Sequence, residues 1–361
     1  MNISAQRDSS ATNTALSVKA YAAQSPTSPL APYSFERRAV GLKDVLIEIE
    51  YSGICHSDIH QVRDEWGGSI FPMVPGHEIL GTVRSVGSKV SKFKVGDVVG
   101  VGCMVDSCRT CGSCKDGLEQ YCETGFVPTY NGLEKDKKTP TQGGYSTHIV
   151  TEEDFVLRIP AGLDKAGAAP LLCAGITTYS PMRYVGLGKG HKIAVLGLGG
   201  LGHMAVKLAA SFGAEVSVLS GSASKEVDAK RLGASHFILT KEKTEVAKYQ
   251  NHFDFILDTV AAKHNLNQAL DLLKREGTLI MVGASHEPLD LGVFSLIMKR
   301  RKMMGSLIGG IKETQEMLDH CGKHKIVSDI ELISASQINE AYERMIKGQV
   351  KYRFVIDAKT F

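Results

Sequence analysis

The chain is 361 residues long, and apolar residues make up 43% of it and charged residues 22%. This length favours two domains over a single core. The composition is that of a soluble globular protein, and no apolar run approaches the roughly eighteen residues of a membrane-spanning helix. The formal net charge of +3 gives no reason to expect nucleic acid or a membrane surface as a partner, which leaves small molecules. Eight cysteines without a secretory signal favour reduced thiols and a cytoplasmic location.

The first part of the chain is polar and is followed by strand signals. Residues 1–16, rich in Ser, Thr, Asn and Ala, predict a flexible leader, and order is expected from Ser17 onward. From there to about residue 160, short alternating apolar stretches are separated by Gly, Pro and Asp, which predicts β-strands joined by turns. Strands are expected at 44–53, 81–87, 95–102 and 145–150.

After residue 165, buried strand patterns alternate with helical ones, which indicates βαβ units and a parallel sheet. Strands are expected at 192–197, 215–220, 253–260 and 277–284. Helices are expected at 201–213, in the segment that ends at residue 234, and at 266–275. The C-terminal part predicts helices at 312–321 and 336–348 and a closing strand at 352–357.

Four cysteines in a Gly-rich stretch have the spacing of a metal site: Cys108, Cys111, Cys114 and Cys122. One folded loop with this spacing brings four sulfurs to the corners of a tetrahedron, the geometry of a closed structural Zn²⁺ site. Disulfides would need an oxidising compartment, and an iron–sulfur cluster favours a different spacing. A zinc module for nucleic acid would need a basic face, whereas acidic residues outnumber basic ones over 103–125.

A glycine-rich turn, GLGGLG at 197–202, directly follows the strand pattern IAVL. In this βα context the glycines permit a tight turn, the approach of the backbone to a pyrophosphate, and close packing of helix on strand. The helix N-terminus adds free N–H groups and the positive end of its dipole. We therefore expect a dinucleotide at Gly197, Gly199, Gly200, Leu201 and Gly202.

The end of the next strand pattern favours NADP(H) over NAD(H). NAD sites usually place Asp or Glu about twenty residues beyond the glycines, where the carboxylate binds the ribose 2′-OH. Here Ser220, Ser222 and Lys225 occupy that region, and the first carboxylate is Glu226. Hydroxyls and an ammonium suit a 2′-phosphate, which a carboxylate would repel. The serines can also cap the following helix, a role that is compatible with phosphate binding.

Three short segments carry further candidate ligands: GICHSDIH with Cys55, PGHEILG with His77 and Glu78, and LLCAGITTYSP with Cys173. Each alone is ambiguous, because a single Cys or His is more often a packed core residue. Together, two thiolates and one imidazole form a set known for catalytic zinc in alcohol dehydrogenases. With the four-Cys loop and GLGGLG in this order, the chain resembles the zinc-dependent medium-chain alcohol dehydrogenases, and specifically the cinnamyl alcohol dehydrogenase branch.

The resemblance covers all of the chain except the leader and implies an α/β fold. A GroES-like, mainly-β catalytic domain is expected at 17–172 and 311–361, and a doubly wound Rossmann domain with a parallel sheet at 173–310, its crossover helix beginning near Cys173. The resemblance implies a catalytic zinc on Cys55, His77 and Cys173, with Glu78 as a fourth ligand that alternates with water or substrate. It also implies a homodimer that forms through the Rossmann sheets.

The resemblance also implies roles for single residues at positions that match the family. Ser57 and His60 are expected to form a proton relay. Trp66 and Met104 are expected to line the substrate pocket, although Trp66 also suits an ordinary core position. Additional cofactor contacts are expected from His56, for which packing is the alternative, and from Thr177, Thr259, Val260, Val282, Gly283, Ala284, Ser306, Leu307 and Ile308.

The implied activity is that of an NADP(H)-dependent zinc alcohol dehydrogenase, working mainly as an aldehyde reductase on aromatic substrates such as cinnamyl or benzyl aldehydes, or on medium-chain aliphatic ones. A redox-inactive NADPH-binding scaffold protein is one alternative, although such relatives typically lack the catalytic ligands. A zinc-module interaction protein built on the four-Cys loop is a second alternative. A polyol dehydrogenase is the third, but that group usually carries an acid after the second Rossmann strand.

Overall fold

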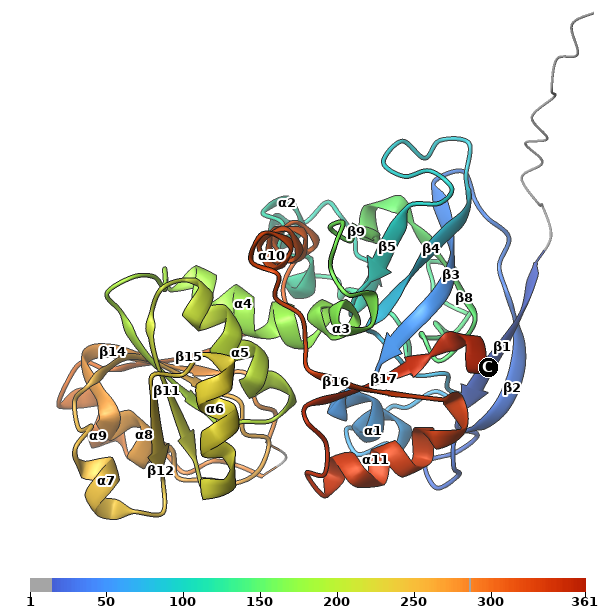
Figure 1. Cartoon of the computed structure of the whole chain (residues 1–361). Helices are drawn as coiled ribbons and strands as arrows, with labels where there is room; N and C mark the ends of the chain where they lie inside the picture. Colours follow the sequence, from blue (N-terminus) through green and yellow to red (C-terminus); the bar gives the residue numbers. More distant parts are fainter. Residues whose placement is uncertain (1–14, 286) are drawn as a thin grey trace, which may run out of the picture.

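The computed structural model describes residues 15–285 and 287–361, and it divides into two lobes (Figure 1). Residues 1–14, which include most of the expected leader, lie outside the described residues. The first strand, β1 (Leu16–Ala22), already contains Leu16, the last residue of that expected leader. We call the lobe around the six-stranded sheet the parallel-sheet lobe, and the lobe around the seven-stranded sheet the mixed-sheet lobe.

The parallel-sheet lobe is a Rossmann fold. Its strands run in the order β12-β11-β10-β13-β14-β15, and every neighbouring pair is parallel. The chain order reverses between β10 and β13, which creates the switch point where such sheets bind ligands. The strands are β10 (Lys192–Leu196), β11 (Glu215–Ser220), β12 (His236–Leu239), β13 (Phe253–Asp258), β14 (Leu273–Met281) and β15 (Lys302–Gly305). The helices are α5 (Gly200–Ser211), α6 (Glu226–Leu232), α7 (Lys243–Ala247), α8 (Leu266–Leu272) and α9 (Val293–Ile297).

The prediction for 266–275 was wrong in its last three residues. The helix ends at Leu272, because Leu273 adopts an extended backbone with ψ of 136° and pairs with Phe253 of β13. The strand expected at 277–284 therefore begins at Leu273 and ends at Met281. Pairing with a buried neighbouring strand outweighs the helical pattern of the sequence there.

The mixed-sheet lobe is mainly β, as the GroES-like assignment predicts. Its strands run in the order β16-β17-β3-β4-β5-β9, β8 also pairs with β3, and all pairs are antiparallel except β16–β17. These strands are β3 (Asp44–Gly53), β4 (Ile79–Val86), β5 (Val98–Val101), β8 (His148–Glu152), β9 (Leu157–Arg158), β16 (Ile330–Ile333) and β17 (Arg353–Asp357). Two small sheets pair β1 with β2 (Ala31–Arg37) and β6 (Met104–Asp106) with β7 (Val127–Pro128).

The remaining helices are short except for α4 and the two near the C-terminus. They are α1 (His56–Val62), α2 (Gly112–Lys115), α3 (Lys165–Ala168), α4 (Ala174–Tyr184), α10 (Ile311–His324) and α11 (Ile338–Ile346). In α10 the buried residues are Thr314, Met317, Leu318 and Cys321, at the spacing of one helical face, which explains why the sequence pattern there predicted a helix. Single 3₁₀ turns occupy Glu119–Tyr121, Glu153–Phe155, Ala169–Leu172, Ala223–Lys225, Ala335–Gln337 and Ala358–Thr360.

Helices α4 and α10 join the two lobes (Figure 1). One apolar core runs from Leu157 of the mixed-sheet lobe through Ile176 of α4 and Leu318 of α10 to Val206 of α5. The lobes therefore share buried surface and do not have fully separate cores. Over the residues that the structure describes, none of the helices combines the length and the apolar character needed to cross a membrane.

Candidate active site

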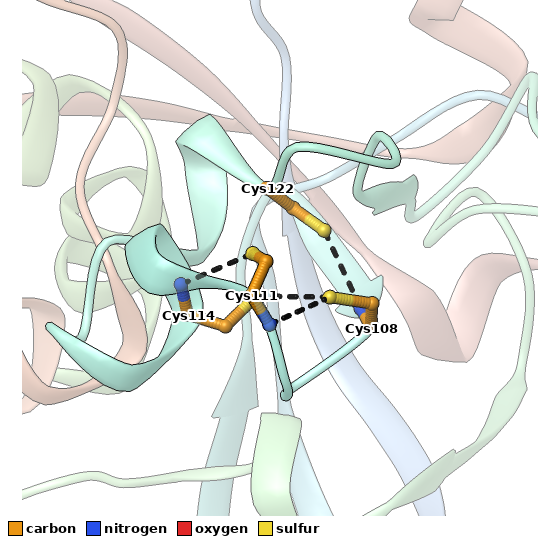
Figure 2. Close-up of side chains that lie close together, drawn as sticks. All are labelled: Cys108, Cys111, Cys114 and Cys122. Atoms are coloured by element: carbon orange, nitrogen blue, oxygen red, sulfur yellow. Dashed lines mark hydrogen bonds between the residues drawn. The ribbon is translucent and has the colours of Figure 1, made fainter.

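The four cysteines of the Gly-rich loop converge on one point (Figure 2). Their sulfur atoms all lie within 4.8 Å of one another, and those of Cys108 and Cys114 are 3.9 Å apart. A tetrahedral Zn²⁺ with bonds of ~2.3 Å holds its sulfurs ~3.8 Å apart, so the geometry fits zinc. The short helix α2 produces this arrangement, because the sulfur of Cys111 caps it and accepts from the N–H of Cys114 at 3.5 Å.

Backbone amides prepare the sulfurs of this loop to carry negative charge. The N–H groups of Thr110 and Cys111 donate to the sulfur of Cys108 at 3.5 and 3.3 Å and lower the pKa of Cys108 to about 5. The N–H of Cys108 itself donates to the sulfur of Cys122 at 3.4 Å. Hydrogen bonds to a thiolate favour the form that binds metal.

The scattered ligand candidates form a second cluster at the junction of the lobes. One ligand atom from each of Cys55, His77, Glu78 and Cys173 lies within 4.8 Å of the other three, and the sulfurs of Cys55 and Cys173 are 3.9 Å apart. Cys55 precedes α1, His77 and Glu78 precede β4, and Cys173 precedes α4, so three element starts present the ligands. A hydrogen bond with Cys173 holds the pKa of Cys55 well below its ordinary value.

Asp58, which the sequence analysis did not single out, positions the histidine of this cluster. Its buried carboxylate lies 3.1 Å from Nδ1 of His77 and accepts from the backbone N–H of Cys55 at 2.8 Å and of Gly76 at 3.2 Å. Tyr145 donates its hydroxyl to the same carboxylate at 3.2 Å. Because Nδ1 of His77 is engaged, Nε2 is the atom left to bind metal.

Arg353 is the second residue that the sequence analysis missed. Its buried guanidinium forms an ion pair with Glu78 and donates to the carbonyl of Ile54 at 2.8 Å. Burial raises the pKa of Glu78 to about 7, although the charge of Arg353 opposes this shift. The second carboxylate oxygen of Glu78, Oε2, is buried and has no hydrogen-bond partner among the described residues, which fits a ligand that can turn toward a cation.

The expected relay residues lie on α1 beside the cluster. The hydroxyl of Ser57 is 3.6 Å from the sulfur of Cys55, whereas His60 pairs with Glu65 and its ring centroid lies 4.9 Å from that of Trp66. His56 is exposed one turn earlier. Trp66 itself is 43% exposed, so the core position considered for it is wrong.

The glycine turn follows β10 and opens α5, as expected. Gly197 has a φ of +91°, and a Cβ on Gly202 would lie 2.1 Å from the carbonyl oxygen of Gly197, so neither position tolerates a side chain. A Cβ on Gly199 would meet no atom of the described part of the chain within 4 Å, which leaves open space above the turn for a phosphate. A Cβ on Gly200 would lie 3.0 Å from Cδ of Arg353, so Arg353 touches both the turn and the candidate metal cluster. Leu201 follows in the first turn of α5.

The hydroxyl and ammonium groups expected near a 2′-phosphate follow β11. Ser220 ends the strand, and its Oγ accepts from the N–H of Ser222 at 3.2 Å. The Oγ of Ser222 is 2.9 Å from that of Ser224 on the exposed surface. Lys225 ends the 3₁₀ turn that leads into α6.

Most of the other expected cofactor residues lie in the loops at the carboxyl edge of the parallel sheet. Thr259 follows β13 and donates its hydroxyl to the carbonyl of Leu196 at 2.9 Å, while Ser306 follows β15 and donates its N–H to Met281 at 3.1 Å. The loop after β14 packs tightly, because a Cβ on Gly283 would lie 2.4 Å from the carbonyl of Val260. The same edge holds Val282, Ala284 and Leu307, and Thr177 is buried in α4.

The expected pocket residue Met104 is buried on β6. It borders a small cavity together with Cys103 and Ile308, so β6 and the segment after β15 face each other. The sulfur of Cys103 is 3.7 Å from the carbonyl of Leu172, and the neighbouring Cys103 raises the pKa of Cys173 well above its ordinary value, so a non-ligand thiol lies beside the metal cluster. Trp66 follows α1 and Met104 lies on β6, so the two expected pocket residues come from different parts of the mixed-sheet lobe.

Comparison with known proteins identifies both lobes. Residues 41–161 match the alcohol dehydrogenase GroES-like domain, and residues 200–323 match the zinc-binding dehydrogenase domain. The chain is 55% identical over 341 residues to NADP-dependent alcohol dehydrogenase C 1 of Mycolicibacterium smegmatis, covering 94% of this chain and 97% of that one. It is 54% identical over 347 residues to the aldehyde reductase YahK of Escherichia coli, covering 96% and 99%.

A solved structure agrees with these relatives. The cinnamyl alcohol dehydrogenase of Helicobacter pylori, complexed with NADP(H), is 45% identical, superimposes with a TM-score of 0.90, and covers 96% of this chain and 99% of that one. The match extends over both lobes. This chain belongs to the zinc-binding medium-chain alcohol dehydrogenases, in the branch of the cinnamyl alcohol dehydrogenases.

Proposed function

We propose that the chain is an NADP(H)-dependent zinc alcohol dehydrogenase that works mainly as an aldehyde reductase. The observation that carries this proposal is the cluster of Cys55, His77, Glu78 and Cys173, which Arg353 joins directly to the dinucleotide turn. The proposed metal site and the proposed cofactor site would thereby lie side by side. The names of the relatives, an NADP-dependent alcohol dehydrogenase and an aldehyde reductase, support the same reaction.

The chain's own residues divide the work in this mechanism. Cys55, His77 and Cys173 would hold a catalytic zinc, and Glu78 would serve as the fourth ligand that gives way to water or substrate. Zinc bound there supplies a Lewis acid that polarises a carbonyl oxygen or lowers the pKa of an alcohol. Asp58 keeps the histidine oriented, because its carboxylate fixes Nδ1.

Proton transfer falls to α1. Ser57 lies next to Cys55, where its hydroxyl can pass a proton to or from the oxygen that reacts. His60, which is partly exposed and paired with Glu65, is the group that would exchange this proton with water. The loop cysteines Cys108, Cys111, Cys114 and Cys122 offer no open position and would hold a second, structural zinc.

The cofactor is proposed to bind along the carboxyl edge of the parallel sheet and to supply or accept the hydride. Its pyrophosphate would lie on the glycine turn with Arg353, and its 2′-phosphate on Ser220, Ser222 and Lys225. The nicotinamide end and ribose would meet His56, Thr177, Thr259, Val260, Val282, Gly283, Ala284, Ser306, Leu307 and Ile308. The H. pylori relative is complexed with NADP(H) in its solved structure, which supports the phosphorylated cofactor.

The substrate is proposed to be an aromatic aldehyde such as a cinnamyl or benzyl aldehyde, or a medium-chain aliphatic one, next to Trp66 and Met104. Apolar pockets separate such substrates by only about 1–3 kcal/mol per methylene, so a range of aldehydes is expected to react. An inert NADPH-binding scaffold would not need four converged ligands. A polyol dehydrogenase would usually carry an acid after the second Rossmann strand, where this chain has Ser220, Ser222 and Lys225.

We also propose the domain limits and assembly that the resemblance implies. Residues 17–172 and 311–361 would form the catalytic domain and 173–310 the cofactor domain. A homodimer would form in the cytoplasm through the free edge of β15. Helix α9, which precedes β15 in the chain, and the residue after it expose an apolar surface made of Val293, Phe294, Ile297 and Met298. Exposed apolar patches of this kind usually mark protein interfaces.

The test is an assay of NADPH oxidation over cinnamyl, benzyl and medium-chain aliphatic aldehydes, with zinc measured on the same sample. Cys55→Ala is expected to abolish turnover and lower zinc from two to one per chain, while the dissociation constant for NADPH stays within about threefold, because the glycine turn is intact. Cys321→Ala, at a buried cysteine of α10, is the control that should keep both zinc ions and turnover. Unchanged turnover in Cys55→Ala would exclude the proposed function.

A further inference from the structure

The segment that leads into β17 crosses from the mixed-sheet lobe to helix α6 of the parallel-sheet lobe. Tyr352 donates its hydroxyl to Oδ2 of the buried Asp228 at 2.9 Å. Lys351 lies 2.8 Å from the same oxygen through its ammonium. Asp228 is on the first turn of α6, three residues after Lys225, so this contact places two residues of the mixed-sheet lobe beside the proposed 2′-phosphate site.

Lys225 faces the same segment. Its ammonium lies 5.1 Å from the ring centroid of Tyr352, in the geometry of a cation–π contact. Burial and the neighbouring ammonium of Lys351 lower the pKa of Lys225, against the opposing effect of Asp228. The two ammonium groups, one from each lobe, therefore repel each other across the ring of Tyr352 and the carboxylate of Asp228, which they contact.

The surrounding ion pairs do not balance this positive charge. Asp329 pairs with Lys207 and Arg231, both at 2.5 Å, and Arg231 also lies 3.6 Å from Asp228. Asp228 in turn pairs with Lys351. In this chain of contacts the three cations Lys207, Arg231 and Lys351 share the two carboxylates of Asp228 and Asp329. Lys225 is a fourth cation at the end of the chain of contacts. These groups together carry an excess of two positive charges at the junction of the lobes.

We propose that Lys351 is a second cation for the 2′-phosphate, so that NADP(H) is held by ammonium groups from both lobes, Lys225 from one and Lys351 from the other. This inference rests on the proposed NADP(H) cofactor. An ammonium has three N–H donors, so Lys351 can keep its contact with Asp228 and still donate to a phosphate. NAD(H) lacks the 2′-phosphate, so the two ammonium groups would have no anion between them when NAD(H) binds. Their repulsion then disfavours NAD(H), in addition to the attraction that favours NADP(H).

Isothermal titration calorimetry of the zinc-loaded protein with 2′,5′-ADP and 5′-AMP tests this inference without any turnover. Lys351→Met is expected to weaken binding of 2′,5′-ADP about tenfold, the scale of one charge-assisted hydrogen bond, and to change binding of 5′-AMP less than about twofold. The matched control is Lys248→Met, since Lys248 is also paired with a carboxylate and its side chain is 64% exposed against 65% for Lys351. This control should bind both nucleotides as the unchanged protein does.

Removing Lys351 also leaves Asp228 with Arg231, at 3.6 Å, as its remaining ion-pair partner, and the less balanced carboxylate would repel a phosphate. The double variant Lys351→Met with Asp228→Asn separates the two effects. Direct phosphate binding predicts that this double variant binds 2′,5′-ADP more weakly than Asp228→Asn alone, whereas equal affinities would overturn the inference. Equal weakening of both nucleotides by Lys351→Met, or no weakening, would overturn it too. If the protein without substitutions binds 2′,5′-ADP and 5′-AMP with equal affinity, the proposed preference for NADP(H) itself is contradicted.

Discussion

Asp58 shows how one buried carboxylate organises the candidate zinc site. It receives hydrogen bonds from two backbone amides and a tyrosine and faces Nδ1 of His77, so a single side chain fixes α1, the segment before β4 and the histidine tautomer. Mutation of the group that hydrogen-bonds a metal-binding histidine typically lowers metal affinity about 10- to 100-fold.

Asp58→Asn is therefore expected to lower the affinity of the catalytic site for zinc about tenfold or more, because the amide no longer stabilises the proton on Nδ1. Zinc retention during dialysis against a chelator measures the effect. The matched control is Asp258→Asn, which removes the charge of another buried aspartate paired with a histidine, His264 at 2.6 Å. If both variants retain two zinc ions as firmly as the unchanged protein, Asp58 does not position the ligand.

Cofactor preference is also decided by single residues. Ser222→Asp combined with Lys225→Ala places a carboxylate where the ribose 2′-OH of NAD(H) is expected and removes an ammonium for the 2′-phosphate. The ratio of kcat/KM for NADPH to that for NADH should fall by about a hundredfold or more, because an attraction is replaced by a repulsion. An unchanged ratio in steady-state assays with both cofactors would show that these residues do not bind the phosphate.

At the scale of elements, the loop that holds Cys108–Cys122 supports more than its own fold. Arg109 joins it to Glu152 of β8, and the hydroxyl of Tyr121 accepts from the N–H of Leu307 at 3.1 Å. Glu119 accepts from the N–H of Ile311 at 3.0 Å, at the start of α10. The loop thus supports the segment 306–311, which borders the expected nicotinamide end of the cofactor site.

Cys108→Ser should act on stability before it acts on chemistry. Loss of the structural zinc removes the free energy that folds this loop, so the melting temperature is expected to fall by about 5 °C or more, with one zinc remaining per chain. Calorimetry and zinc analysis on the same sample measure both effects. Near-normal thermal stability, with zinc still lost, would show that the loop folds without its metal.

Element boundaries and short helices were the parts of the fold that the sequence predicted least well. The strands at 44–53 and 215–220 could be predicted to within a residue, because their alternation or continuous burial is written in consecutive residues. The boundary at Leu273 could not, because it depends on a partner, Phe253, that is distant along the chain. Helices α1 and α2 were not predicted either, since they are short helices fixed by ligand-bearing loops.

At the scale of the whole molecule, a shared apolar core and an exposed apolar surface have different consequences. The shared core through α4 and α10 connects the lobes within one chain. The apolar surface of α9 is not covered by any of the described residues, and its Phe294 is 76% exposed. Burying that surface between two copies would extend the six-stranded sheet across β15.

Phe294→Glu is accordingly expected to shift the protein from dimer to monomer, because a carboxylate would be buried without a partner. Light scattering coupled to size-exclusion chromatography measures the mass directly. Tyr184→Glu is the matched control, since Tyr184 is 79% exposed on α4 and lies outside α9 and β15. A Phe294→Glu protein that remains dimeric would place the interface elsewhere.

The sequence by itself determined the kinds of groups at each site. The spacing of the four-Cys loop, the GLGGLG turn and the absence of a carboxylate from Ser220 to Lys225 are local patterns, and local patterns can be recognised in a single sequence. The structure brought all eight expected cysteine, histidine and glutamate ligands into two clusters, as those patterns and the resemblance predict.

Only the tertiary structure decided which groups act on those sites from a distance. Arg353 and Lys351 lie outside the motifs, and Asp58 lies within GICHSDIH but has no metal-ligand role that the sequence shows. Folding brings Asp58 against His77, Arg353 against Glu78 and Gly200, and Lys351 against Asp228. The physical reason is that charge and hydrogen bonding act through space over a few ångströms. A ligand set can be read along the chain, but the groups that orient it and that select its cofactor are defined only once the two lobes meet.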